Sequence, residues 1–336
     1  MEEVLICVPT TPNARAKRRI AALMDEIEIL KQDKAMKQRK TTYYVSQGRA
    51  IRRMVVLYTP IEDLITENDR CCEDRNTGDC AVPSAEQDRL QRGYVELTKV
   101  LPWIHEKLAS LDNEESEDML KKLKQGTDSA CGDDTGTLKE LMALWVNIER
   151  RPTSLLRADD KHHRGFMSNA CSKLLCPAEW HWDDPIVKAG IRDRTVTFIV
   201  SGNLWPSYMY EDYEADSKNL ERGLMKSKLL LIPLQAFKAI FTSPSSANEV
   251  DGEVKTCVAS IIGMRKVTPR AIAYTACQVR FALSNITSWR IMDGDFDYQI
   301  FWNNRVDFFE DTLGPAARAR VNELLEWWTR QVTDHQ

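Results

Sequence analysis

Apolar residues recur at helical spacing along most of this chain, and the densest run of them lies near the C-terminus. Residues 223–283 hold two apolar segments of helical length, joined by a Ser/Pro turn and by a second turn at Thr268-Pro269. The second segment places four apolar residues on one helical face: Ile272, Ala276, Val279 and Leu283. We therefore expect residues 223–283 to form the structural centre, with proline in the first turn of the second helix.

Capping residues predict where several other helices begin. Ser84 precedes Gln87 by three residues and Asp112 precedes Glu115 by three, which is the spacing of a helix N-terminus. Asp184-Pro185 predicts a further start, because proline is tolerated in the first helical turn. These signals are local, so each predicts a helix without reference to the rest of the fold. Pro102 is expected to kink the long helix that begins after Ser84.

Two segments are predicted to interrupt the helices. Residues 126–136 (GTDSACGDDTG) are rich in turn-forming residues and are expected to form a linker, with Thr137 capping the next helix. Residues 151–215 carry few periodic runs, and residues 195–200 (TVTFIV) are their one strand-like run. The chain is therefore predicted to be mostly α: a helical bundle-like globular protein with a loop-rich middle segment and at most a minor β-hairpin.

Charge is distributed unevenly, although the formal net charge is only −4. Residues 1–60 contain 12 Lys and Arg against 6 Asp and Glu, whereas residues 61–150 contain 11 against 21. A basic start before an acidic middle predicts an anionic partner for the start, or contact between the two regions. We divide the chain into a basic, partly disordered and partly helical extension (1–42), an N-terminal helical region (43–150) and a C-terminal region with a loop-rich start and a helical core (151–336).

A short apolar stripe runs through the basic extension. Its members are spaced by three and four residues: Ile20, Leu23, Ile27 and Leu30. Basic residues precede and follow the stripe, as in a basic-zipper dimer. The stripe lasts only about two heptads, because Lys34 and Lys37 occupy the next seam positions. Two interpretations stay open: a coiled coil between chains, or an amphipathic helix that docks on its own chain or frays in solution.

Clusters of arginine and lysine form a candidate nucleic-acid-binding site. The candidates are Arg15, Lys17, Arg18 and Arg19 before the stripe, and Arg49, Arg52 and Arg53 on a helix predicted over residues 46–58. Such side chains bind phosphate oxygens through charged hydrogen bonds. The alternative for the second group is a solvated helix face.

One segment of the middle region offers residue types that bind metal. His162, Cys171, Cys176 and His181 are ligands that zinc accepts, but they are spaced more widely than in finger motifs. The alternative is a packed loop around a small apolar plug. The chain carries no glycine-rich phosphate loop, HExxH, GxSxG or paired CxxC motif, so we assign no catalytic residue and no cofactor.

The cysteines and the first residues bear on the compartment. Nine Cys are scattered along the chain, and the first residues lack the basic and long apolar regions of a signal peptide. No apolar run approaches the roughly 20 residues that span a bilayer. We expect an intracellular protein, cytoplasmic or nuclear, with no membrane partner.

Several segments together resemble a known family. They include KTTYYVSQGRAIRRMVVLYTPIEDLI, LWPSYMY, GLMKSKLLL, AIFTSPSSA, GMRKVTPRAIAYTACQVRFAL and ELLEWWTRQV. Over roughly residues 40–332 the chain is similar to an uncharacterised domain-of-unknown-function family abundant in mushroom-forming fungi. The resemblance implies many copies per genome, compatible with a link to mobile elements, and it implies no activity or catalytic residue. The chain departs from the family's pattern between Ser243 and Met264.

These features favour a non-enzymatic interaction protein that binds protein partners or self-associates. The alternative is a nucleic-acid-binding protein that uses the basic extension and is related to mobile elements. A third hypothesis is an enzyme whose site is assembled in space from five residues: His162, His163, Asp183, Arg270 and Tyr274.

Overall fold

The computed structural model describes residues 12–77, 82–231 and 266–333. Three predictions therefore lie wholly or partly outside the described residues. They are the disordered start, the end of the first helix within residues 223–283, and the Ser/Pro turn that follows that helix.

The chain separates into two compact units, each described here by itself. The first unit comprises residues 1–44 and the second comprises residues 45–336. Helix α1 (Pro12–Met54) begins in the first unit, and its residues 45–54 belong to the second. The predicted domain boundaries at residues 42 and 150 stay predictions, because a compact unit is not by itself an independently folding domain.

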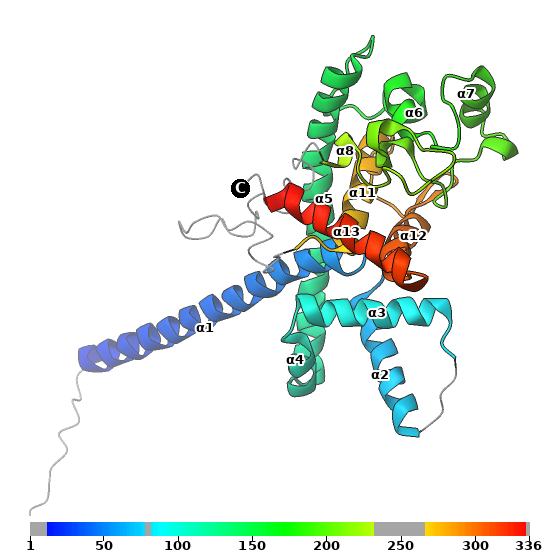
Figure 1. The fold of residues 1–336 in the computed structure, drawn as a ribbon. Coiled ribbons are helices and arrows are strands. Elements are labelled where there is room, and N and C mark those ends of the chain that lie inside the picture. The colour runs from blue at the N-terminus through cyan, green and yellow to red at the C-terminus, as the bar shows by residue number, and fades with distance from the viewer. Residues whose placement is uncertain (1–11, 78–81, 232–265, 334–336) are drawn as a thin grey trace, which may run out of the picture. The chain divides into compact units, whose positions relative to one another are not determined.

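The described part of the second unit is built mainly from helices (Figure 1). Its longer helices are α2 (Ile61–Thr77), α3 (Ala85–Val100), α5 (Asn113–Arg150), α11 (Pro269–Leu283), α12 (Tyr298–Glu310) and α13 (Gly314–Thr333). Its shorter ones are α4 (Ile104–Ser110), α6 (Asn169–Leu175), α7 (Pro185–Arg192) and α8 (Lys228–Leu231). Short 3-10 helices are η1 (Gly165–Met167), η2 (Val196–Phe198), η3 (Ser207–Met209) and η4 (Glu211–Tyr213).

The sheet in the described residues is a single antiparallel hairpin. Strand β1 (Met292–Asp293) pairs with β2 (Phe296–Asp297), so that Met292 lies opposite Asp297. The predicted mostly α fold with a minor hairpin is thereby confirmed. None of the described helices combines the length and the apolar character needed to cross a membrane.

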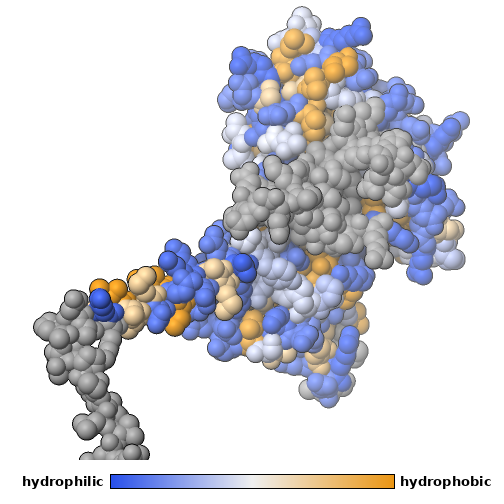
Figure 2. Space-filling model, turned by 90° about the vertical axis from the view of Figure 1, so that its left-hand side faces the viewer, coloured by the Kyte–Doolittle hydropathy of each residue, from blue (hydrophilic) through white to orange (hydrophobic). Residues whose placement is uncertain are grey.

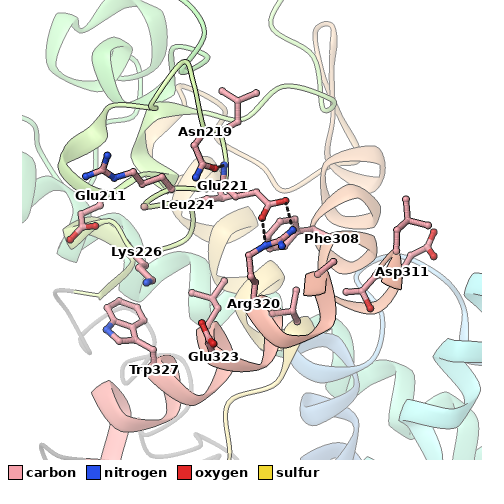
Figure 3. Close-up of a pocket in the computed structure, with 18 of the residues that line it drawn as sticks. Glu211, Asn219, Glu221, Leu224, Lys226, Phe308, Asp311, Arg320, Glu323 and Trp327 are labelled. Carbon is pink, nitrogen blue, oxygen red and sulfur yellow. Dashed lines mark hydrogen bonds and ion pairs between the residues drawn. The ribbon is translucent and has the colours of Figure 1, made fainter. Parts of the chain in front are cut away.

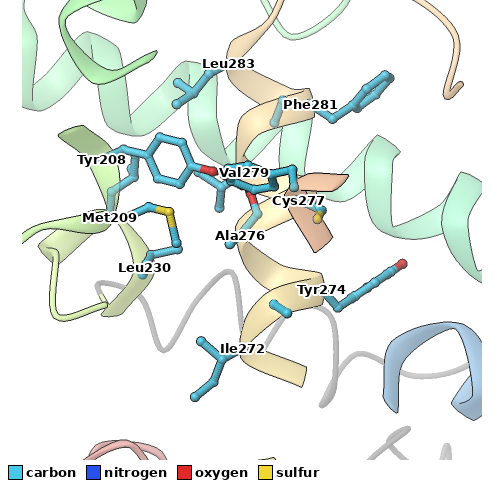
Figure 4. Close-up of a cluster of buried hydrophobic side chains, with 14 of the residues drawn as sticks. Tyr208, Met209, Leu230, Ile272, Tyr274, Ala276, Cys277, Val279, Phe281 and Leu283 are labelled. Carbon is cyan, nitrogen blue, oxygen red and sulfur yellow. Dashed lines mark hydrogen bonds between the residues drawn. The ribbon is translucent and has the colours of Figure 1, made fainter. Parts of the chain in front are cut away.

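Helix α11 is the buried centre of the second unit. Its residues from Arg270 to Leu283 are all buried, and its main helix neighbours are α5 and α12. Figure 4 shows Tyr208 and Met209 on one side of α11 and Tyr274 on the other. The Tyr208 hydroxyl donates a hydrogen bond to the Ala276 carbonyl at 2.8 Å. A helix that is buried on every side is a core helix. The prediction of a central helix after Thr268 is therefore confirmed.

Several predicted N-caps form as their spacing requires. The Ser84 side chain accepts from the Gln87 backbone, and the Gln87 side chain accepts from the Ser84 backbone, which completes a capping box. Asp112, Asp184 and Thr268 likewise accept hydrogen bonds from the first turns of α5, α7 and α11. Each cap satisfies N–H groups that lack a partner within the helix.

The predicted linker at residues 126–136 is wrong, because these residues continue α5 without a break. A Cβ on Gly126 would lie 2.1 Å from the Val45 carbonyl oxygen, and a Cβ on Gly48 would lie 2.0 Å from the Leu123 carbonyl oxygen. These two glycines therefore let the backbones of α1 and α5 approach closely. The close approach, rather than a turn, explains glycine at these positions.

Four smaller predictions of local structure also differ from the structure. No helix begins at Ser46, because α1 continues to Met54. Residues 195–200 contain the 3-10 helix η2 rather than a strand. Pro102 separates α3 from α4 instead of bending one helix, since proline lacks the N–H that a helix interior needs. Thr137 lies inside α5 and caps nothing.

Candidate interaction surfaces

The first unit carries an exposed apolar seam on α1. Its members Ile20, Leu23, Ile27 and Leu30 are 57%, 50%, 49% and 60% exposed, respectively. Figure 2 shows apolar side chains interspersed with hydrophilic ones along this helix. Their spacing places isoleucine at two a positions and leucine at two d positions of consecutive heptads. A helix with one apolar stripe is stable when that stripe is covered, so the seam is the first candidate surface.

Basic side chains surround the seam. Lys17 and Arg19 are exposed on the turn before it, and Lys34 and Lys37 are exposed at the two seam positions after it. Arg15 and Arg18 belong to α1, but their side chains lie outside the described residues. This part of α1 therefore presents positive charge together with its apolar residues.

Two arginines further along α1 have partners on α5. Arg49 Nη2 lies 2.6 Å from Asp133 Oδ2, and Arg52 Nη2 lies 2.9 Å from Asp128 Oδ1. The predicted contact between the basic start and the acidic middle thus occurs within the second unit. The two guanidinium groups that the sequence predicts to bind phosphate are therefore paired with carboxylates of the same chain.

The third arginine, Arg53, belongs to a buried polar network. Its Nε and Nη2 donate to the two carboxylate oxygens of Asp134 at 2.8 and 2.7 Å. The Tyr274 hydroxyl donates to Asp134 Oδ2 at 2.7 Å, and the Gln278 amide donates to the Tyr274 hydroxyl at 3.0 Å. Burial, with the neighbouring Asp134 carboxylate, raises the pKa of Tyr274 well above its usual range and keeps it a donor. Arg53 is therefore not a surface phosphate ligand but part of a link between α1, α5 and α11.

The four candidate metal ligands lie in different surroundings. Cys171 and Cys176 are buried in two separate hydrophobic clusters, whereas His162 and His181 are exposed. Burial raises the pKa of Cys176 to about 12, which disfavours the thiolate that zinc binds. Within residues 12–77, 82–231 and 266–333, no three or more His, Cys, Asp and Glu residues are grouped to hold a metal. The structure therefore does not bring the candidate ligands together.

The residues of the enzyme hypothesis are also separated. Three of them form ion pairs with residues outside the proposed set. The pairs are His163–Asp160, Asp183–Lys173 and Arg270–Glu310. Arg270 lies in the first turn of α11, whereas Lys161, two residues before His163, donates to the Phe281 carbonyl near the end of that helix. A helix rises 1.5 Å per residue, so the two groups lie at opposite ends of α11.

A groove of about 1390 Å³ is the second candidate surface. It lies between residues 211–226 and α13, and Figure 3 shows Glu221 facing Arg320 across it. Arg320 Nε donates to Glu221 Oε2 at 2.7 Å, and Lys226 Nζ lies 5.3 Å from the centroid of the Trp327 ring. The lining combines apolar side chains with charges of both signs, which is compatible with a protein-binding surface.

Sequence reasoning did not identify this groove, although adjacent tryptophans carry a signal for it. Consecutive helical residues point about 100° apart, so a helix on the surface rarely buries both members of such a pair. Trp328 is buried in the core, whereas Trp327 is partly buried and lines the groove. A tandem Trp pair on an amphipathic helix thus indicates one core residue and one residue at a surface.

Comparison with known proteins identifies a family without an assigned function. The model of a family of unknown function, DUF6698, matches residues 125–333. The match includes α11 and the groove, whereas the seam on residues 12–44 lies outside it. No curated protein and no solved structure matches the chain significantly.

Proposed function

We propose that this chain, which belongs to the DUF6698 family of unknown function, is a non-enzymatic interaction protein that self-associates through the seam on α1. The exposure of Ile20, Leu23, Ile27 and Leu30 carries this proposal. The occupant of the seam is a second copy of the same helix, aligned in parallel.

The identities of the seam residues support a parallel pair. Isoleucine at a with leucine at d favours a coiled coil of two parallel helices, because the packing geometry at these two positions differs. Ile20 and Ile27 occupy a, and Leu23 and Leu30 occupy d. Lys34 at the next a position disfavours larger assemblies and limits the length of the apolar contact.

Charges beside the seam support the same alignment. In a parallel pair, a g residue faces the e residue five positions further along the second helix. Glu26 occupies g and Lys31 occupies e in the heptads defined by the seam. The two chains would then form two symmetry-related Glu26–Lys31 pairs. Because the seam covers about two heptads, the association is expected to be weak and dependent on protein concentration.

The matched substitutions Ile27→Lys and Ile29→Lys test the proposal in the full-length chain. Ile27 lies in the seam, whereas Ile29 lies two positions away at c and is 60% exposed. We expect Ile27→Lys to abolish self-association in analytical ultracentrifugation and Ile29→Lys to preserve it. Equal behaviour of the two variants, whether both associate or neither does, would remove the seam as the contact.

A charge exchange tests the parallel alignment. Lys31→Glu places two acidic residues opposite each other and should weaken association by a few-fold, the scale of an exposed ion pair. Adding Glu26→Lys should restore it by re-forming the pair with reversed signs. If the double variant associates no better than Lys31→Glu alone, the helices are not paired in this register.

The alternative function, nucleic-acid binding, is supported by the exposed basic residues around the seam. A basic helix paired by a short zipper can place both basic segments along one duplex. Lys17→Ala with Arg19→Ala should then weaken DNA or RNA binding and reduce its salt dependence, because fewer counterions are released. Unchanged affinity in a filter-binding assay would show that Lys17 and Arg19 do not contact the nucleic acid. A mobile-element link and a fungal setting stay predictions from the resemblance.

We place this activity inside the cell, in the cytoplasm or nucleus. Four buried cysteines of the second unit are free thiols: Cys131, Cys171, Cys176 and Cys277. Free thiols are typical of reducing compartments, which supports this location. Microscopy of the tagged full-length protein in its native cells would test it.

A further inference from the structure

A cavity of about 250 Å³ in the second unit is lined by a buried arginine with unused hydrogen-bond donors. Arg280, in the last turn of α11, is 3% exposed. Its Nε and Nη1 are buried and have no hydrogen-bond partner in the part of the chain that the structure describes. The Asp293 Oδ2 atom lies 3.9 Å from Nη2, which is beyond hydrogen-bond distance. Buried donors without an acceptor are costly, so an acceptor placed here would bind favourably.

The other buried arginines in the described ranges all have an acceptor. They donate to carboxylates or backbone carbonyls: Arg49, Arg53, Arg164, Arg270 and Arg305. Arg280 and Arg305 both stack on an aromatic ring, since their guanidinium carbons lie 3.5 Å from the centroid of Phe296 and 3.6 Å from that of Phe301, respectively. Arg305 also donates to the Gly202 carbonyl, whereas Nε and Nη1 of Arg280 have no acceptor in the described residues. Stacking occupies a flat face of the guanidinium group and leaves its N–H edges free to bind an acceptor.

The cavity has a polar side and an apolar side. Arg194 lines the polar side with Arg280, but Asp295 already accepts from Arg194 Nη2 at 2.6 Å. The apolar side is formed by aromatic and aliphatic side chains: Phe166, Leu175, Ile191, Phe198 and Val200. The volume is below the roughly 300–1,000 Å³ of sites for drug-sized ligands, so a ligand that fits it is small.

We infer that this cavity binds a small organic acid, with its carboxylate on Arg280 and its apolar body against Phe166 and Phe198. An ionised carboxylate accepts hydrogen bonds from guanidinium more strongly than a neutral oxygen does. Asp293 opposes the ligand, because its negative charge lies near the same guanidinium group. The cavity belongs to the second unit, so the inference does not depend on self-association through α1.

Titration of the full-length protein with benzoate and isovalerate, followed by calorimetry, tests the inference. Benzamide, which has nearly the shape of benzoate without its charge, is the matched control. At least one acid should bind, and benzamide should bind about tenfold to a hundredfold more weakly than benzoate, if benzoate is that acid. Failure of both acids, or equal binding of benzoate and benzamide, would overturn the inference.

Three substitutions locate the carboxylate. Arg280→Met, which keeps a similar volume, should reduce acid binding about tenfold or more. Arg194→Met removes an arginine from the same lining but should change binding by less than about threefold, since Asp295 already holds that side chain. Asp293→Asn should tighten binding, because it removes the opposing charge. Weakening by Arg194→Met as large as that by Arg280→Met would contradict the assigned position.

The fold of the Arg280→Met variant is a separate readout. Within the described residues, Arg280 is a buried cation whose Nε and Nη1 lack an acceptor and whose ion pair with Asp293 is as long as 3.9 Å. Replacing it with an apolar side chain of similar size should leave the melting temperature unchanged or raise it. If the variant unfolds instead, Asp293→Asn and the benzamide control still decide the question. Unchanged or weaker acid binding by Asp293→Asn would then count against Arg280 as the anchor.

Discussion

Helices α1 and α11 place their apolar residues in opposite surroundings. Residues of α11 are buried on every side from Arg270 to Leu283, between α5 and α12. The seam residues on the first unit's part of α1 are roughly half exposed, with Ile27 at 49%. A dense run of apolar residues therefore predicts a core helix, because such a helix has no polar face to leave in water. A single stripe predicts a contact but does not identify the partner.

The largest expected effect comes from placing the same charge in both helices. Ile272→Lys in α11 buries an unpaired charge in the core and should destabilise the second unit by more than about 4 kcal/mol. Ile27→Lys in α1 should change the free energy of unfolding by less than about 0.5 kcal/mol. Urea denaturation, at concentrations below those at which the chain self-associates, measures both. A large loss of stability in Ile27→Lys would mean that the seam already has a partner within its own chain.

The second prediction concerns the network that joins α11 to α1. Asp134→Ala leaves Arg53 buried without its carboxylate and should cost about 3–5 kcal/mol. The control is Asp128→Ala, which removes a carboxylate that is 62% exposed and should cost about 0–1 kcal/mol. Urea denaturation of each variant compares them. Similar costs would show that Asp134 does not hold the two helices together.

The third prediction concerns pH and the end of α11. Burial, with the charges of Lys139 and Arg164, lowers the pKa of Lys161 to about 6. Between that pKa and the higher pKa of the unfolded chain, the unfolded state binds one more proton, so stability rises with pH. Relative to Lys161→Met, the wild type should gain about 1 kcal/mol per pH unit from pH 6 to 8. A difference that is constant with pH would contradict the buried, neutral lysine.

The fourth prediction compares two glycines of α5. Gly126→Ala places a Cβ against the Val45 carbonyl and should destabilise the protein by about 1–3 kcal/mol. In the described part of the chain, a Cβ on Gly132 would meet no atom of another segment within 4 Å, so Gly132→Ala should stabilise the helix by about 0.5–1 kcal/mol. Thermal unfolding followed by circular dichroism gives both signs. Stabilisation by both substitutions would show that the close approach of α1 and α5 is not required.

The parts of the fold that depend on local chemistry could be predicted from the sequence. Ser84, Asp112, Asp184 and Thr268 cap helices because the groups they satisfy lie within three residues. The continuity of α5 could not be predicted in this way. Gly126 opens a segment whose composition is typical of a turn. Glycine is required there because the helix lies against the backbone of Val45, which is far away in the sequence.

For the candidate surfaces, too, features set by nearby residues can be predicted from the sequence, whereas features set by distant residues cannot. The seam can be predicted from the sequence, since its period is visible within Ile20–Leu30. The partners of Arg49, Arg52 and Arg53 cannot, because their carboxylates lie on α5, some 75 to 85 residues later. Arg280 does not stand out as a site because it lies in the apolar run of α11. An arginine within such a run is itself the signal of a buried charge that needs an acceptor.

Sedimentation equilibrium of the wild-type, full-length chain tests self-association through α1 most directly. Pairing through the seam should give a reversible change from the monomer mass to twice that mass as the concentration rises. The change should be lost in Ile27→Lys but not in Ile29→Lys. A single monomer mass across the micromolar range and above, or a larger assembly that Ile27→Lys leaves intact, would contradict it.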